Sequence, residues 1–188
     1  MNLLGVSFSV SPMLVLFAAI AVYIGYGKIC LLTILAAFLH ECGHLLALFA
    51  LGVRISSVRI GAFGAEINIA PCGRREELLS AAAGPACNLL CAAVFWRPFH
   101  LFAVLHLLLA AYNMLPVDPL DGGRILRVLF GRRIAYAVGF TFCGAIVVLS
   151  FHHALQSSDW LLFGAVCLLF LRLILQSGRC FFGASGIK

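Results

Sequence analysis

The fold is decided by one stretch of the chain, Phe38-Leu39-His40-Glu41-Cys42-Gly43-His44-Leu45-Leu46. In it, two histidines stand four residues apart and a glutamate follows the first, which is the H-E-x-x-H pattern. On a helix, His40 and His44 lie on one face, one turn apart, so both imidazoles can reach one metal ion. Zn²⁺ accepts imidazole nitrogen readily, and Glu41 beside it can take a proton from a bound water. The pattern predicts a metal site.

The residues on either side of this pattern are almost wholly apolar. Residues 31–38 and 45–51 contain a single polar side chain, that of Thr33. The three polar groups of the pattern are therefore expected inside a membrane-spanning helix, where ionisable side chains are costly and mark functional sites. The alternative is a pair of hydrogen-bonded histidines that only stabilises a helix bundle, and we prefer the metal site.

The composition is that of an integral membrane protein. Of the 188 residues, 63% are hydrophobic and 11% are charged, and the mean hydropathy is +1.10. Soluble domains are about 45–50% apolar and about 25% charged. We expect a single membrane-embedded domain over residues 1–188, without a cleavable signal. The net charge of +6 resides in short loops between apolar runs, so it does not indicate nucleic-acid binding.

The eight cysteines form no C-x-x-C pair, and most lie within apolar runs. Free cysteine in such surroundings behaves as a small hydrophobic residue. We interpret the cysteines as packing residues rather than as disulfides or metal ligands.

Six apolar segments can be drawn, and a membrane span needs about 20 apolar residues. The segments cover residues 12–27, 29–51, 78–96, 99–115, 134–151 and 160–175. With both termini in the cytoplasm, every Lys and Arg except Lys28 and Arg97 falls on the cytoplasmic side, as the positive-inside rule requires. The sequence thus predicts an all-α polytopic membrane protein with about six transmembrane helices.

A different pattern separates the second and third segments. β-Branched residues nearly alternate with polar ones over residues 53–60 and 66–69, and Gly61-Ala62-Phe63-Gly64 interrupts them. This pattern favours a small, membrane-associated β-hairpin after the second helix. A plain cytoplasmic loop is the alternative.

A catalytic zinc usually has three protein ligands and an open position, so two histidines are one ligand short. The third is expected from residues 113–124, Asn-Met-Leu-Pro-Val-Asp-Pro-Leu-Asp-Gly-Gly-Arg. Pro116 and Pro119 break the fourth segment, and the glycine pair that follows lets the backbone approach other groups closely. Asp121 and Asp118 are both candidates, and spacing alone does not separate them. Asp121 could instead cap the helix that begins at Gly122.

Three motifs together resemble the site-2 protease family of intramembrane zinc metalloproteases (peptidase family M50). They are His-Glu-Cys-Gly-His at 40–44, Ala-Gly-Pro-Ala-Cys-Asn at 83–88, and the stretch from Asn113 to Gly123 with its Asn-Met-Leu-Pro and Pro-Leu-Asp-Gly-Gly elements. Within the family, the chain resembles the bacterial stage IV sporulation protein FB group. Members of that group carry a cytoplasmic nucleotide-sensing CBS domain after the membrane core. No such domain is expected here, because the chain ends soon after its last apolar segment.

The resemblance implies specific roles for residues of the motifs. His40, His44 and Asp121 become the ligands of one zinc ion per chain, and Glu41 becomes the catalytic base. This selects Asp121 over Asp118.

The same resemblance implies that Asn113, Pro116 and Asn88 contribute to substrate binding. The alternative for Asn88 is an interhelical hydrogen bond. The remaining histidines lie outside the motifs and are expected in interfacial or hydrogen-bonded positions: His100, His106, His152 and His153.

We therefore predict a zinc metalloendopeptidase, multi-pass in the bacterial cell membrane, that cleaves a peptide bond within or near a transmembrane segment of a membrane-associated protein substrate. The resemblance suggests a sporulation pro-sigma factor as substrate, and inhibitory membrane proteins as further partners. The rival hypothesis is a metal-ion transporter or a metal-sensing membrane protein. A transporter has no need of Glu41 as a base and usually shows polar residues along a path through several spans, whereas here the polar residues concentrate in two stretches.

Overall fold

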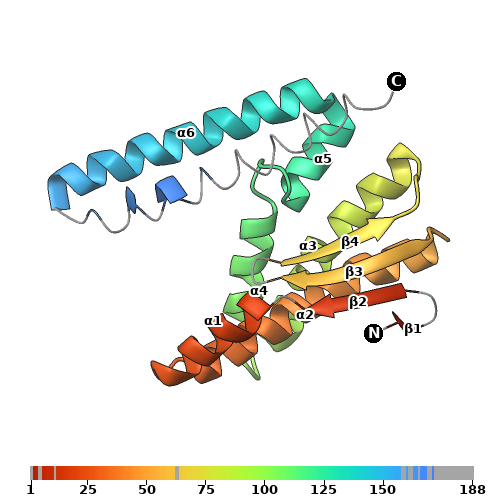
Figure 1. The fold of residues 1–188 in the computed structure, drawn as a ribbon, viewed down its shortest axis with the longest axis horizontal. Coiled ribbons are helices and arrows are strands. Elements are labelled where there is room, and N and C mark those ends of the chain that lie inside the picture. Colours follow the sequence, from red (N-terminus) through yellow and green to blue (C-terminus); the bar gives the residue numbers. More distant parts are fainter. Residues whose placement is uncertain are drawn as a thin grey trace. The chain divides into compact units, whose positions relative to one another are not determined.

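The structure is a computed structural model that describes residues 2–3, 6–10, 12–61 and 64–157, and beyond these only residues 160, 163–164, 166–168 and 171. The chain divides into two compact units, Met1–Asn113 and Met114–Lys188 (Figure 1). Each unit is described by itself.

The N-terminal unit contains a four-stranded sheet in the order β1-β2-β3-β4. The strands are β1 (Asn2–Leu3), β2 (Val6–Val10), β3 (Ile55–Gly61) and β4 (Gly64–Ile69). β1 pairs antiparallel with β2, β2 pairs parallel with β3, and β3 pairs antiparallel with β4. A parallel pair needs a crossover connection, and here helices between β2 and β3 provide it.

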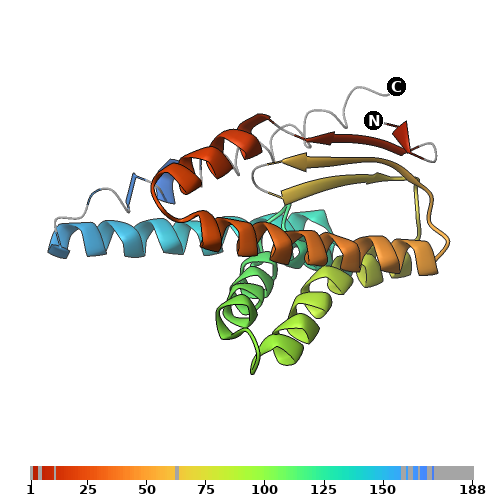
Figure 2. The ribbon, with the colours of Figure 1, turned by 90° about the horizontal axis from the view of Figure 1, so that it is seen from below.

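Four helices complete this unit: α1 (Pro12–Tyr23), α2 (Gly27–Ala50), α3 (Arg74–Phe95) and α4 (His100–Asn113). Figure 2 shows the sheet on one side of α2, with α3 and α4 on the other. At 1.5 Å per residue, the 24 residues of α2 reach about 36 Å, which exceeds the ~30 Å hydrocarbon core of a bilayer.

One face of α2 is buried, and the H-E-x-x-H histidines lie on it. The buried residues recur at helical spacing: Ala36, His40, Gly43, His44 and Leu48. The buried face of α3 consists almost entirely of small side chains: Ser80, Ala81, Gly84, Pro85, Asn88 and Ala92. Small residues let two helix backbones approach closely, so α3 can come near both histidines.

The C-terminal unit contains α5 (Asp121–Phe130) and α6 (Arg132–Ser157). Gly122 and Gly123 allow the start of α5 to press against the loop before it. A Cβ atom at Gly122 would overlap the carbonyl oxygen of Met114, and one at Gly123 would overlap the backbone nitrogen of Asp118.

The structure is mostly helical, and it differs in detail from the prediction. Three helices in the described part of the chain are long and apolar enough to cross a membrane: α2, α3 and α6. α1 has 12 residues and α4 has 14, both fewer than the segments predicted there. The predicted segment 160–175 lies largely outside the described residues, so the six-span count remains a prediction.

The predicted hairpin region contains β3 and β4, but these strands belong to a larger sheet. Strands β1 and β2 were not predicted, and residues 62–63 of the turn lie outside the described residues. The association of this sheet with a membrane remains a prediction.

Candidate metal centre

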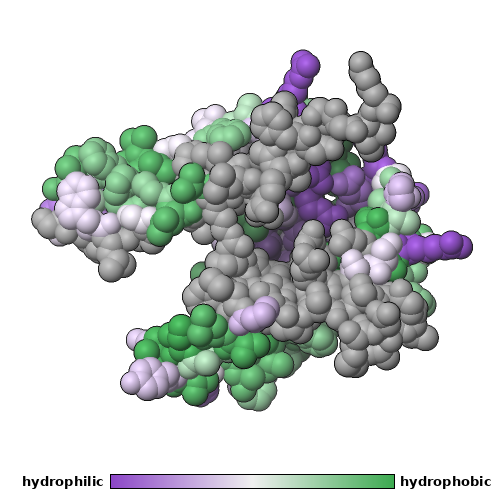
Figure 3. Space-filling model, in the orientation of Figure 1, coloured by the Kyte–Doolittle hydropathy of each residue, from purple (hydrophilic) through white to green (hydrophobic). Residues whose placement is uncertain are grey.

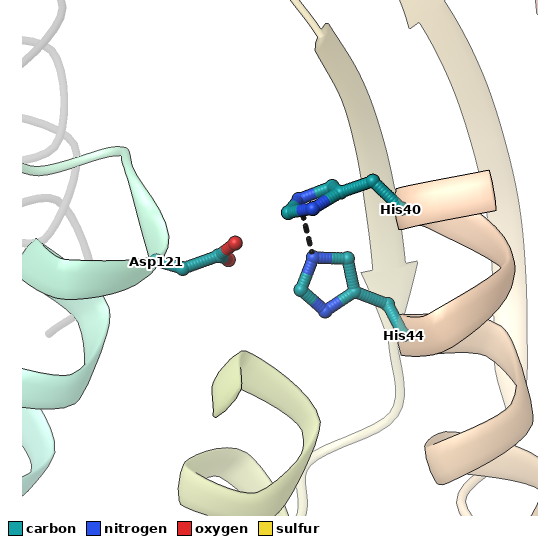
Figure 4. Close-up of side chains that lie close together, drawn as sticks. All are labelled: His40, His44 and Asp121. Carbon is teal, nitrogen blue, oxygen red and sulfur yellow. Dashed lines mark hydrogen bonds between the residues drawn. The ribbon is translucent and has the colours of Figure 1, made fainter. Parts of the chain in front are cut away.

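His40 and His44 project from the buried face of α2 (Figure 4). Their Nε2 atoms lie 3.1 Å apart. Two Zn–N bonds of about 2.0–2.1 Å at a tetrahedral angle place the two nitrogens roughly 3.3 Å apart. The pair therefore fits the requirements of a zinc site without a rearrangement of the helix.

The second ring nitrogen of His44 fixes which nitrogen carries the proton. Its Nδ1 lies 2.7 Å from the carbonyl oxygen of Ser80 on α3. A carbonyl only accepts, so Nδ1–H donates and Nε2 keeps its lone pair. Metal-binding histidines are usually held in this way, and the geometry of His44 matches that of a ligand.

His40 is held by a side chain rather than by the backbone. Its Nδ1 lies 3.0 Å from the amide of Asn88 on α3, and the other end of that amide lies 2.9 Å from Nδ1 of His106 on α4. Asn88 is 0% exposed. The prediction that Asn88 contacts substrate gains no support from this position, because its side chain lies behind His40 and has no accessible surface.

Gly84 brings α3 against both imidazoles. A Cβ atom at this position would overlap Nε2 of His44 and lie 2.7 Å from Cε1 of His40. Gly43 lets α2 approach α3 closely, because a Cβ there would lie 2.7 Å from Cβ of Cys87. The two helices can therefore meet at the level of the histidines only because both positions lack a side chain.

Glu41 follows His40 on α2 and is half-buried. It is thus less enclosed than the two histidines that flank it, which are both buried. A base that exchanges protons with water needs such partial access.

In the C-terminal unit, Asp121 is the first residue of α5 and is buried. α5 begins at Asp121, and the residue at its N-cap position is Leu120. The structure therefore places Asp121 in the first turn of the helix rather than at the cap position. Asp121 also lies 3.9 Å from Arg124, one turn further along α5.

Asp118 is engaged by an arginine. Both of its carboxylate oxygens accept hydrogen bonds from one guanidinium nitrogen of Arg127, each at 3.0 Å. A carboxylate held in a part-buried ion pair of this kind is a poor competitor for a metal ion, because binding the metal would break the pair.

The two remaining predicted substrate-binding residues are half-buried. The Asn113 amide donates to the carbonyl of Leu109 at 3.0 Å, within α4. The carbonyl oxygen of Pro116 faces Gly139 of α6, where a Cβ would lie 3.0 Å from it. None of these contacts tests substrate binding, so both roles stay predictions.

Comparison with known proteins identifies relatives of one kind. Residues 90–151 match the family described as Peptidase family M50. The chain is 29% identical over 178 residues to Stage IV sporulation protein FB of Bacillus subtilis, covering 82% of this chain and 61% of that protein. It is 25% identical over 119 residues to Zinc metalloprotease MJ0392 of Methanocaldococcus jannaschii, covering 56% of this chain and 35% of that protein. The chain thus spans less than two thirds of these relatives.

A solved structure, the Site-2 Protease from Methanocaldococcus jannaschii, superposes with a TM-score of 0.70 at 19% identity. The match covers 94% of this chain and 93% of that chain. This likeness establishes the fold. Together with the family match, it confirms the resemblance that the three motifs indicate.

Proposed function

We propose that this chain, which matches peptidase family M50 and has the fold of a site-2 protease, is an intramembrane zinc metalloendopeptidase. One observation carries the proposal: His40 and His44 lie buried on a helix of membrane-spanning length, with their Nε2 atoms 3.1 Å apart. A merely structural pair of histidines does not explain the glutamate between them.

Asp121 is proposed as the third ligand. Two imidazole nitrogens and a carboxylate oxygen are a known ligand set of catalytic zinc, and His40, His44 and Asp121 offer it from buried side chains. The ion pair with Arg127 weighs against Asp118. When bound, zinc supplies Lewis-acid polarisation of a carbonyl and lowers the pKa of a bound water to about 7.

Glu41 is proposed as the base. It accepts a proton from the attacking water and passes it to the amine that leaves the cleaved peptide. Asn113 is a candidate for stabilising the developing oxyanion, because its amide lies in the same motif as Asp121.

The substrate is proposed to bind along β4. The strand order leaves β4 at the edge of the described sheet, with β3 as its neighbour there. A peptide bond inside a helix has its carbonyl already hydrogen-bonded, so a few substrate residues must unwind first. Adding these residues to a sheet edge gives their backbone groups partners without reading their side chains closely.

The cellular setting follows from the prediction and from the relatives. We place the protein in a bacterial cell membrane as a multi-pass protein with both termini in the cytoplasm. The sporulation relative supports a sporulation role, with a membrane-associated pro-sigma factor as the predicted substrate and inhibitory membrane proteins as predicted partners.

The test uses purified protein in detergent or vesicles, loaded with zinc and mixed with candidate single-span peptides. We expect cleavage that a chelator abolishes and that added zinc restores. Glu41→Gln should keep about one zinc per chain and lose cleavage, because it removes the proton acceptor and spares the ligands. Cleavage by the zinc-loaded variant would exclude Glu41 as the base. Zinc uptake into vesicles without cleavage of any peptide would favour the transporter hypothesis.

A further inference from the structure

A chain of hydrogen bonds leads from His40 into the interior of the N-terminal unit. It runs from Nδ1 of His40 through the Asn88 amide to Nδ1 of His106. His106 is 0% exposed, and its Nε2 has no hydrogen-bond partner among the described residues. Its ring is held by aromatic neighbours instead, stacked on Phe95 and edge-on to Phe102. Within the described part of the chain, the one hydrogen bond of the His106 ring is therefore to Asn88.

This chain can run in two directions, because a half-turn of the Asn88 amide exchanges its oxygen and its nitrogen. In the first direction, the amide N–H donates to Nδ1 of His40, whose proton then sits on Nε2, and Nδ1–H of His106 donates to the amide oxygen. In the second direction, Nδ1–H of His40 donates to the amide oxygen. The amide N–H then donates to Nδ1 of His106, whose proton sits on Nε2.

Only the second direction is compatible with a metal ion at His40. A ligand nitrogen must offer a lone pair, and Nε2 of His40, the atom that faces His44, has one only when the ring proton is on Nδ1. Both directions keep both imidazoles neutral and satisfy both hydrogen bonds. They differ in where each ring carries its proton and in the contact between the two Nε2 atoms. In the first direction Nε2–H of His40 donates to Nε2 of His44, whereas in the second both Nε2 atoms offer a lone pair, which only a metal ion between them would satisfy.

We propose that His106 is a positioning residue of the metal centre. By accepting the amide N–H of Asn88, it turns the amide oxygen toward His40 and so keeps a lone pair on Nε2 of His40. Without this acceptor, a buried amide N–H would lose its partner, which is costly. The amide would then turn to donate to His40 and move the proton of that ring to the nitrogen that should bind the metal. This inference rests on the proposed function in one respect, namely that His40 is a ligand.

The first test measures zinc affinity by competition with a chromophoric chelator. His106→Phe keeps an aromatic ring between Phe95 and Phe102 but removes the acceptor, and should lower zinc affinity roughly 10–100-fold, the range seen when a group that orients a ligand is lost. His106→Asn places an amide oxygen where Nδ1 stood and should restore most of the affinity. His100→Phe is the matched control, since His100 is an exposed histidine of the same helix that packs on Trp96.

The outcomes distinguish a failure of the role proposed for His106 from a failure of the proposed function. Wild-type zinc affinity in His106→Phe overturns the role of His106, and so does an equal loss in His106→Phe and His106→Asn, because packing would then explain the effect. If the wild-type chain binds zinc and a double variant, His40→Ala with His44→Ala, binds it equally well, the proposed function itself is overturned.

A second measurement uses the wild-type protein and so does not depend on the folding of a variant. In the zinc-loaded wild-type protein with ¹⁵N-labelled histidine rings, nitrogen chemical shifts distinguish protonated from unprotonated ring atoms. We expect His106 to carry its proton on Nε2 and a lone pair on Nδ1. A proton on Nδ1 of His106 in the zinc-loaded protein contradicts the proposal.

Discussion

Gly84 shows how one missing side chain shapes the centre. In a helix interior, replacing glycine by alanine normally stabilises by about 0.4–1 kcal/mol. At Gly84 the steric conflict should outweigh that gain, because a Cβ would overlap the ring of His44 and press on that of His40. We expect Gly84→Ala to lower zinc affinity by about tenfold or more. Gly144→Ala is the control, since a Cβ at Gly144 meets nothing within 4 Å. Equal zinc affinities in the two variants would show that α3 can move away.

The choice between the two aspartates can also be tested one residue at a time. Asp121→Ala should lose both zinc and activity, because it removes the proposed third ligand. Asp118→Ala should keep its zinc but unfold at a lower temperature, because it leaves the part-buried Arg127 without its carboxylate. Measuring the metal content and the midpoint temperature of thermal unfolding of both purified variants decides which aspartate is the ligand. The opposite pattern of metal content would reverse the ligand assignment.

From the sequence, residues that meet along one helix can be placed together more readily than residues that meet across several helices. His40, Glu41 and His44 are close in sequence, so their helical spacing alone brings them together. Asn88 lies 48 residues after His40 and 18 before His106, and no local pattern relates the three. One signal was present: an asparagine in an apolar helix needs a buried partner. Which partner it has depends on how α2, α3 and α4 pack, and the sequence does not contain this directly.

At the level of elements, sequence patterns predicted strands that pair with a neighbour in the sequence. The alternation over residues 53–69 indicated β3 and β4, which follow each other in the sequence and pair antiparallel. Residues 6–10, Val-Ser-Phe-Ser-Val, also alternate between apolar and polar side chains, but the strand β2 that they form was not predicted. Their partner β3 lies about 50 residues away and runs parallel. A pairing across two intervening helices has no sequence signature as clear as that of a hairpin.

The position of β4 at the sheet edge gives a proline scan a specific expected pattern. Successive backbone N–H groups of a strand point in opposite directions, toward the neighbouring strand and toward the open edge. Proline removes the N–H at its own position. Among Glu66, Ile67, Asn68 and Ile69, one alternate pair should therefore lose bonds to β3 and destabilise the protein. The other pair should fold, bind zinc and cleave slowly.

The control for this scan lies in the substrate. Helix-breaking residues placed near the scissile bond should partly restore cleavage by the slow variants, because less unwinding is then required. If every proline variant that folds and binds zinc cleaves at the wild-type rate, substrate is not held along β4.

At the scale of the whole molecule, the charge distribution predicts how the chain crosses the membrane. The connection between α2 and α3 and the first turn of α3 contain four arginines, whereas the connection between α3 and α4 contains only Arg97. Basic residues near the ends of spans are retained in the cytoplasm. The 22 residues of α3 reach about 33 Å, enough to cross the hydrocarbon core. These two connections should therefore lie on opposite sides of the membrane.

Single cysteines at these two connections test this orientation. Ser56→Cys and Pro98→Cys change no charge, and both positions are exposed. Ser56 also lies at the irregularity of β3, between the paired residues Ile55 and Ser57, so its replacement should disturb the sheet little. The background is a variant without the eight native cysteines that still binds zinc. In intact cells, a membrane-impermeant maleimide should label the cysteine at 98 only, and after permeabilisation it should label both. Labelling of 56 alone in intact cells would invert the topology, and equal labelling of both would show that α3 does not cross the membrane.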